Sequence, residues 1–156
     1  MKIELIQVGK TVNKIFVEGI NEYLGRIKHY VPFNITTIPE IKNTKSLSES
    51  QQKTLEGTLI LKQLQAQDTV VLLDEHGKEF RSVEFAAWLE KQQQVARRLV
   101  FVIGGPYGFS DDVYERANSK ISLSKMTFSH QMVRLIFCEQ LYRACTIIQG
   151  EPYHHE

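Results

Sequence analysis

The sequence contains few cysteines, no excess of either charge and no long apolar run. Its 156 residues include two Cys, and 19 Lys and Arg stand against 18 Asp and Glu, which gives a formal net charge of +1. This balance excludes a polybasic protein held to nucleic acid by bulk charge, although a local basic patch stays open. No apolar run approaches the roughly 20 residues that cross a bilayer, and no signal-peptide pattern opens the chain. We therefore expect a cytoplasmic protein with no membrane contact.

The two cysteines and five histidines give no sign of a disulfide or a metal site. Cys138 and Cys145 lie seven residues apart, which in a helix separates their Cα atoms by about 10.5 Å. A disulfide needs less than about 7 Å, so both should be free thiols in a reducing compartment. The histidines lack the spacing of metal ligands, and neither H-E-x-x-H nor C-x-x-C occurs. We expect no bound metal.

Length and composition fit a single domain over residues 1–156. Apolar residues make up 42% of the chain and charged residues 24%, which suits a packed core. Short apolar runs alternate with segments of helical periodicity. The runs predict strands over residues 3–8, 33–38, 69–73, 99–103 and 121–123. The alternation predicts an α/β fold, with a mostly parallel sheet flanked by helices.

Capping residues predict where the helices between these strands begin. Ser46 and Glu49 have capping-box spacing, so one helix should start near Leu47. Ser82 is the expected N-cap of the next helix. Residues 74–78, which follow the buried third strand, have the composition of a tight turn.

The last helix is apolar around most of its circumference. Ser129 should cap it, and it should run over residues 130–149. A helix that lies on one sheet needs a single apolar stripe, so this helix needs a second covering surface. Another helix of the same chain is one candidate; we favour a second subunit, and hence a homodimer, because so short a chain has few spare helices. The apolar residues are Met132, Val133, Leu135, Ile136, Phe137, Cys138, Leu141, Tyr142, Ala144, Cys145, Ile147 and Ile148.

Two loops are candidate ligand-binding segments. The glycine-rich segment 104–108 directly follows a buried strand, and ligands on open α/β sheets gather at the carboxyl ends of strands. The dinucleotide pattern G-x-G-x-x-G and the phosphate-loop pattern G-x-x-x-x-G-K-[ST] are both absent. Residues 123–128 mix apolar side chains with free backbone groups, which suits a flat aromatic ring such as adenine. For each loop the alternative is an ordinary connection without a site.

The end of the chain places charged and aromatic groups close together in sequence. Glu139 and Arg143 have the i, i+4 spacing of a structural ion pair. Arg143 also lies near the tail residues 150–154, where Pro152 restricts the backbone. Chain ends usually fray, so a functional tail would be an exception.

Six motifs follow one another along nearly the whole chain. They are I-x-V-G-K at residues 6–10, E-Y-L at 22–24, I-G-G-P-x-G at 103–108, L-S-K-M-T-F-x-H-Q-M-x-R at 123–134, E-Q-x-Y-R-A at 139–144 and P-Y-H at 152–154. In order and spacing, the sequence resembles the ribosomal RNA large subunit methyltransferase H family, a minimal group of SPOUT methyltransferases. Two positions depart from the family pattern: Tyr107 stands where Glu or Asn is common, and Ser129 where Pro is usual.

The resemblance implies an enzyme that uses S-adenosyl-methionine to methylate N3 of a pseudouridine. The target would be a hairpin of 23S ribosomal RNA on the assembled 70S ribosome. The resemblance also implies a homodimer whose sites are built from both subunits, and a SPOUT-type α/β trefoil knot in the C-terminal half. Arg143, Tyr153 and His154 would shape the target-base site. The cofactor contacts would be Leu73, Gly104, Leu123, Ser124, Lys125, Met126, Thr127 and Phe128.

The residue types suit this chemistry. A sulfonium methyl donor needs no metal, only alignment with the acceptor nitrogen and removal of its proton. Imidazole exchanges protons near neutral pH, so His154 is a candidate base, and Arg143 could stabilise the anionic target base. Lys10, Lys14, Lys125 and Arg134 are candidates for local RNA contacts.

Two alternatives stay open from the sequence. One is a non-catalytic ribosome-binding module of the same fold, which loss of cofactor binding would support. The other is a nucleotide-binding α/β reductase, which the missing dinucleotide fingerprint disfavours.

Overall fold

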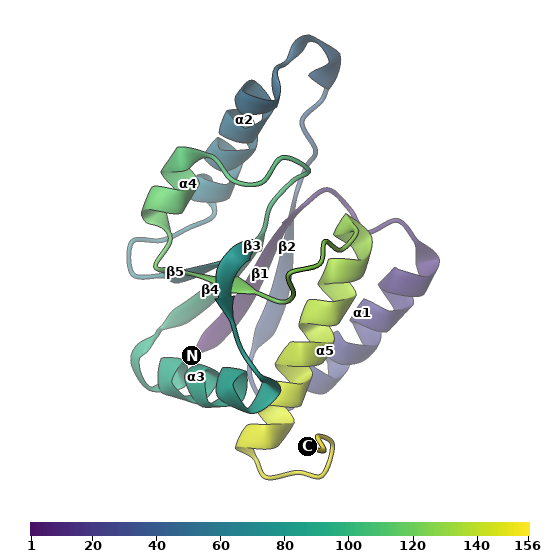
Figure 1. The fold of residues 1–156 in the computed structure, drawn as a ribbon, viewed down its shortest axis with the longest axis vertical. Helices are drawn as coiled ribbons and strands as arrows, with labels where there is room; N and C mark the ends of the chain where they lie inside the picture. Colours follow the sequence, from purple (N-terminus) through teal and green to yellow (C-terminus); the bar gives the residue numbers. More distant parts are fainter.

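Five parallel strands form one sheet in the computed structural model, which describes residues 1–156. The strand order is β2-β1-β4-β3-β5, and each neighbouring pair is parallel. The predicted α/β class with a parallel sheet flanked by helices is confirmed (Figure 1). The strands are β1 (Lys2–Val8), β2 (Phe33–Ile38), β3 (Thr69–Glu79), β4 (Arg98–Ile103) and β5 (Ser119–Ser122).

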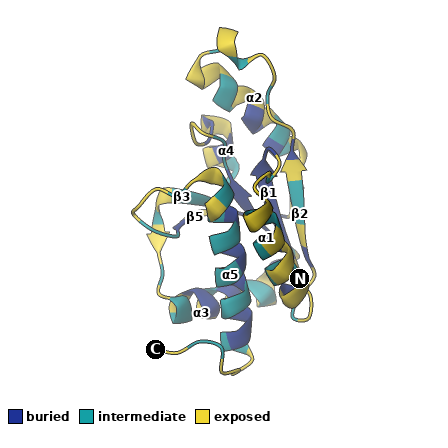
Figure 2. Cartoon of the chain, turned by 90° about the vertical axis from the view of Figure 1, so that its right-hand side faces the viewer, coloured by how far each residue is buried: buried dark blue, intermediate teal, exposed yellow.

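Helices cover both faces of the sheet. The helices are α1 (Lys14–Ile27), α2 (Glu49–Lys62), α3 (Ser82–Val95), α4 (Asp111–Arg116) and α5 (His130–Ile148), with a short 3-10 turn at Thr44–Ser46. The larger core cluster joins one face of the sheet to α1, α3 and α5, and the smaller cluster joins the other face to α2 and α4. Consecutive residues of the central strands alternate between the clusters, as Val100 and Phe101 do. Burial on both faces explains why these strands are continuous apolar runs (Figure 2).

Two predicted boundaries were wrong. Residues 74–78 are not a tight turn: β3 continues to Glu79, because a register shift between Leu73 and Lys78 lets Lys78 pair again with β5. Helix α2 begins at Glu49 rather than near Leu47. Its capping box is formed by Ser48 and Gln51, two residues after the predicted one.

Smaller shifts occur at two other elements. The N-cap of α3 is Arg81, and the predicted cap Ser82 is the first helical residue. Strand β5 covers Ser119–Ser122 instead of residues 121–123. The last helix has the predicted N-cap, Ser129, whose hydroxyl accepts from the backbone N–H of Met132. The knotted C-terminal half stays a prediction.

Helix α5 lies between α1 and α3, so two helices of the same chain cover part of its apolar surface (Figure 1). Both cysteines are buried free thiols, as predicted. Met132 and Ile136 remain at least partly exposed on the outer face. Helices of the same chain, the alternative to a second subunit, therefore cover two sides of α5. An outer apolar strip of α5 remains partly exposed to solvent.

Arg134 anchors the loop between β1 and α1 to helix α5. Its guanidinium donates to the carbonyl of Val8 at 2.7 Å and to the hydroxyl of Thr11 at 2.8 Å. The residue is only 2% exposed, and burial lowers the pKa of its guanidinium. The expectation that Arg134 contacts RNA is wrong, because its side chain is enclosed by its own protein.

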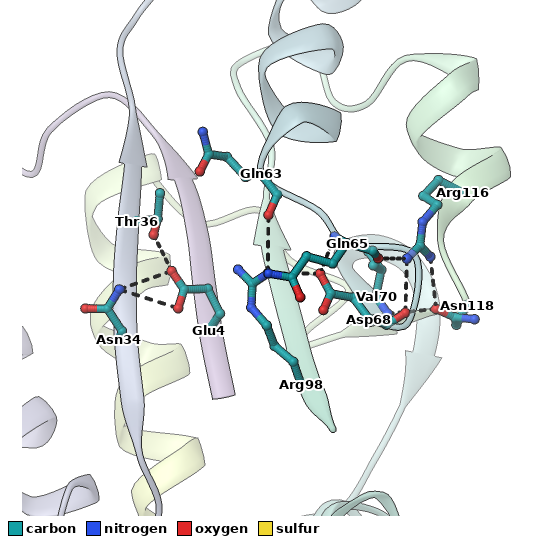
Figure 3. Close-up of polar contacts among 10 residues, drawn as sticks. All are labelled: Glu4, Asn34, Thr36, Gln63, Gln65, Asp68, Val70, Arg98, Arg116 and Asn118. Atoms are coloured by element: carbon teal, nitrogen blue, oxygen red, sulfur yellow. Dashed lines mark hydrogen bonds and ion pairs between the residues drawn. The ribbon is translucent and has the colours of Figure 1, made fainter. Parts of the chain in front are cut away.

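Polar contacts close the edge of the sheet where the strands begin (Figure 3). Asp68, just before β3, forms an ion pair of 3.0 Å with Arg98, the first residue of β4. Arg116 donates to the carbonyls of Gln65 and Asp68 at 2.8 and 3.1 Å. These contacts fix the connections at this edge and leave the opposite edge, where the strands end, to form a cavity. None of the helices has the length and apolarity to cross a bilayer.

Gly57 provides a test of the packing between α2 and α4. A Cβ at this position would lie 3.1 Å from Cβ of Ser110 and 3.2 Å from Cγ2 of Val113. Because Ser110 also caps α4, it has little room to yield. We expect Gly57→Ala to lower the free energy of unfolding by about 1–3 kcal/mol in urea titrations, despite the higher helix propensity of Ala.

Gly25→Ala is the matched control. Gly25 lies in α1, is exposed, and has nothing within 4 Å of an added Cβ. This substitution should stabilise the protein by about 0.5–1 kcal/mol. A Gly57→Ala protein as stable as the wild type would contradict the close packing of the two helices.

Candidate functional site

A cavity of about 500 Å³ opens where β4 and β5 end and where the ladder of β3 is interrupted. In open α/β proteins, ligands usually bind at the edge of the parallel sheet where the strands end. Of the eight residues expected to contact a cofactor, seven line the cavity: Leu73, Gly104, Leu123, Ser124, Met126, Thr127 and Phe128. The eighth, Lys125, does not line it. Its side chain is 84% exposed and its Nζ lies 3.8 Å from Glu79.

The glycine-rich loop forms one wall of the cavity. Gly105 and Gly108 pair across the loop, and Gly108 adopts φ +82°, a conformation that favours glycine. A Cβ at Gly104 would lie 3.0 Å from the ring of Phe109 and 3.2 Å from the carbonyl oxygen of Gly108. The loop therefore needs glycine to fold back on itself so tightly.

The segment 123–128 forms another part of the wall. The hydroxyl of Ser122 donates to the carbonyl of Ser124 at 2.9 Å, and the hydroxyl of Ser124 accepts from the backbone N–H of Met126 at 2.9 Å. These short-range bonds hold the segment in a non-helical turn. Its remaining backbone groups and apolar side chains border the cavity, an arrangement that suits a flat heteroaromatic ring.

Sequence reasoning missed the acidic side of the cavity. Asp74 and Tyr114 both line it, and the Tyr114 hydroxyl donates to Asp74 Oδ2 at 2.5 Å. Burial pushes the pKa of Asp74 upward, but the bonds from Tyr114 and from the backbone N–H of His76 outweigh it and leave that pKa lowered. Burial, followed by the bond to Asp74, raises the pKa of Tyr114. The position of Asp74 after the buried run of β3 was the signal that could have identified it.

A second cluster lies along the second half of α5 and contains the three residues expected to shape the target-base site. Glu139 accepts from Arg143 Nε at 3.1 Å and from the Tyr153 hydroxyl at 3.1 Å. Arg143 also lies 4.8 Å from the centre of the Tyr153 ring and 3.1 Å from Nδ1 of His154. The bond to Glu139 raises the pKa of Arg143. The predicted ion pair of Glu139 and Arg143 is thus confirmed.

The tail is tied to the body of the protein at several points. The Tyr30 hydroxyl donates to Glu151 at 2.7 Å, and this bond raises the pKa of Tyr30 to about 12. Arg81 forms an ion pair of 2.8 Å with Glu156, the last residue. These contacts explain why the chain end packs against the protein instead of fraying (Figure 1).

The contact between Arg143 and His154 fixes the tautomer of the imidazole. A guanidinium contains only donors, so Nδ1 of His154 must accept. In the neutral ring the proton then resides on Nε2. This nitrogen is buried, has no hydrogen-bond partner, and lies 3.7 Å from the nearest carboxylate oxygen, Glu156 Oε1. Within this cluster, His154 has an N–H donor still to satisfy.

Within one chain, the cavity is separated along α5 from the tail cluster, which comprises Glu139, Arg143, Tyr153 and His154. His130 and Val133 line the cavity at the first turns of α5, whereas Arg143 lies near its other end. Val133 is the last residue of α5 that lines the cavity, and the ten-residue step from it to Arg143 corresponds to about 15 Å of helix. Arg143 is therefore not part of the cavity wall of its own chain.

Comparison with known proteins agrees with this geometry. A family model described as "Predicted SPOUT methyltransferase" matches residues 1–154. Proteins named "Ribosomal RNA large subunit methyltransferase H" from Parabacteroides distasonis and Bacteroides fragilis are 64% and 63% identical, with 100% of both chains covered. A protein of the same name from Porphyromonas gingivalis is 54% identical over the same share of both chains. With a match over nearly its full length and relatives this similar, the chain belongs to the SPOUT methyltransferases.

Proposed function

We propose that this protein transfers a methyl group from S-adenosyl-methionine to N3 of a pseudouridine in 23S ribosomal RNA on the assembled ribosome. The observation that carries the proposal is the cavity, which gathers seven of the eight residues expected to contact the cofactor. The names of the relatives support ribosomal RNA as the substrate, and with it a cytoplasmic location. The alternative of a non-catalytic ribosome-binding module has no observation in its favour.

The cavity has the size and lining that this cofactor needs. Its volume of about 500 Å³ falls in the range of small-molecule sites. Apolar side chains such as Leu123 and Phe128 suit the adenine ring, while the carboxylates Asp74 and Glu75 suit hydroxyl and cationic groups. When bound, S-adenosyl-methionine supplies a methyl group already activated on a sulfonium, so no metal or protein nucleophile is required. No group of metal-ligating side chains is present.

A second copy of the chain would complete the site. Arg143 of the tail cluster lies about 15 Å along α5 from Val133, the last cavity-lining residue of that helix. This separation favours action of the tail cluster on the cavity of a partner. The partly exposed strip with Met132 and Ile136 lies on α5, beside the cavity-lining residue Val133 and before Glu139. Pairing of these strips in a homodimer would remove the remaining apolar surface from water and join one cavity to the other tail.

The tail cluster would hold the target base and stabilise its negative charge. Glu139 orients Arg143 and Tyr153 through hydrogen bonds of 3.1 Å. His154 would donate its Nε2–H to an oxygen of the base as N3 loses its proton, and Arg143 adds positive charge beside it. The bond from Arg143 favours this donor role over the base role expected from the sequence. The proton passes to solvent.

The direct test is transfer of a tritiated methyl group. We expect incorporation into 70S ribosomes and much less into isolated subunits, with N3-methylpseudouridine as the product in digests of 23S RNA. Calorimetry with S-adenosyl-homocysteine tests the cofactor site separately. A protein that binds ribosomes but neither cofactor nor product would support the binding-module alternative.

Gly104→Val tests the wall of the cavity. The added side chain would collide with Phe109 and the carbonyl of Gly108 and deform the loop. We expect the affinity for S-adenosyl-homocysteine to fall at least about tenfold in calorimetry, while the far-UV circular dichroism stays native. Gly25→Ala is the control and should bind like the wild type. Unchanged binding by Gly104→Val would remove the glycine-rich loop from the site.

Mixed dimers test whether each site uses two chains. Truncation after Gly150 removes the tail, and Gly104→Val weakens cofactor binding, so at a cofactor concentration well below the variant's dissociation constant each homodimer should be nearly inactive. After equal amounts exchange subunits, half of the dimers are mixed, and each contains one site with both an intact cavity and an intact tail. Methyl transfer should return to about a quarter of the wild-type rate. No recovery, with subunit exchange confirmed, would show that cavity and tail of the same chain work together.

Substitutions of His154 separate the donor role from the base role. His154→Ala should lower the rate of methyl transfer by about 10²–10³. His154→Gln retains an N–H donor and should recover a substantial part of that loss. If His154 were a base, neither Ala nor Gln could replace it, and both variants would lose the same activity. Equal loss in both variants, measured with the same cofactor affinity, would contradict the donor role.

A further inference from the structure

Glu56 places a carboxyl group directly behind the glycine-rich wall of the cavity. The residue belongs to α2, is 3% exposed, and does not itself line the cavity. A Cβ at Gly105, which does line it, would lie 2.7 Å from the carboxyl carbon of Glu56. Gly105 therefore lies directly against this carboxyl and also borders the ligand space.

The carboxyl of Glu56 lacks a counter-charge. Gln52 donates to its Oε2 at 3.2 Å, but its Oε1 is buried and has no hydrogen-bond partner. No Lys, Arg or His lies within ion-pair distance of it. Buried carboxylates are usually paired, since removing a charge from water is costly. Consistent with this, burial raises the pKa of Glu56.

The charged groups nearest to Glu56 do not provide the missing counter-charge. His130 of α5 lies near enough to favour the charged form of Glu56 slightly, and Glu40, which follows β2, opposes it. The two carboxylates that line the cavity differ from Glu56, because hydrogen-bond donors or solvent surround their charge. Asp74 accepts from Tyr114 and the backbone of His76, and Glu75 is half exposed to solvent. Glu56 is thus the carboxyl whose charged form a cationic ligand would stabilise.

We propose that Glu56 is a specificity-determining carboxylate that makes the cavity favour a cationic ligand over a neutral analogue. This inference rests on the proposed function. S-adenosyl-methionine carries a sulfonium, and after the methyl group leaves with its bond to carbon, the sulfur is a neutral thioether. The acceptor N3 gains the methyl group and has lost its proton to solvent. Through its charge, Glu56 thus makes the cavity hold the methyl donor more tightly than the product, which promotes product release.

The test compares two ligands in the full-length protein and in Glu56→Gln. Calorimetry gives the dissociation constants of S-adenosyl-methionine and S-adenosyl-homocysteine at one pH and salt concentration. Glu56→Gln keeps the shape of the side chain and removes its charge. We expect the preference for the cationic ligand to fall about tenfold, as expected for one partly screened charge across a single residue layer. Glu49→Gln, an exposed carboxyl at the start of α2, is the matched control and should leave the ratio unchanged.

The outcomes are distinguishable. A ratio that Glu56→Gln leaves at the wild-type value, or equal weakening of both ligands, overturns this proposal while the proposed function stands. Failure of the wild type to bind either ligand overturns the proposed function itself. If Glu56→Gln does not fold, Glu56→Met removes the same charge with an apolar side chain of similar length, and its ratio decides in the same way.

Discussion

The rigid length of helix α5 is the constraint on which the proposed mechanism depends. Its first turns border the cavity, whereas Glu139 at its middle and Arg143 in its second half hold the tail. A helix of 19 residues cannot bend its two ends together without breaking backbone hydrogen bonds. The distance along α5 between its cavity-lining residues and Arg143 is therefore fixed by the backbone. In the proposed mechanism, association of two chains brings a cavity and a tail together.

The parallel sheet explains why the cavity forms at one edge only. Every strand runs in the same direction, so all loops that leave the strands emerge together and all loops that enter them meet at the opposite edge. The entering edge is closed by the ion pair of Asp68 with Arg98 and by Arg116 (Figure 3). The leaving edge contains glycine and serine loops that cannot fill the space between them. The polar contacts that stabilise the fold and the proposed ligand cavity thus lie at opposite ends of the same strands.

The sequence predicted those features that depend on local patterns. Apolar runs identified the central strands, and Ser129 identified the start of α5, because burial and capping act over a few residues. The continuation of β3 beyond Leu73 was missed, since it depends on pairing with β5, which lies more than forty residues later in the chain. Arg134 was misread as a surface cation for the same reason: its partners Val8 and Thr11 are distant in sequence. Glu56 was overlooked because a single Glu on a polar helix gives no sign of burial.

The tail shows how a chain end acquires a fixed structure without secondary structure of its own. Two contacts at its margins, Tyr30 with Glu151 and Arg81 with Glu156, come from the turn after α1 and from the N-cap of α3. Exposed pairs of this kind contribute little energy individually, so the order of the tail depends mainly on the enclosed group around Tyr153. There the ring packs against Tyr142 with centroids 4.7 Å apart, while its hydroxyl binds Glu139. The aromatic ring supplies the burial, and the polar groups supply the orientation. Because the same Glu139 also holds Arg143, any shift of the tail displaces the guanidinium as well, and the proposed target-base site moves as one unit.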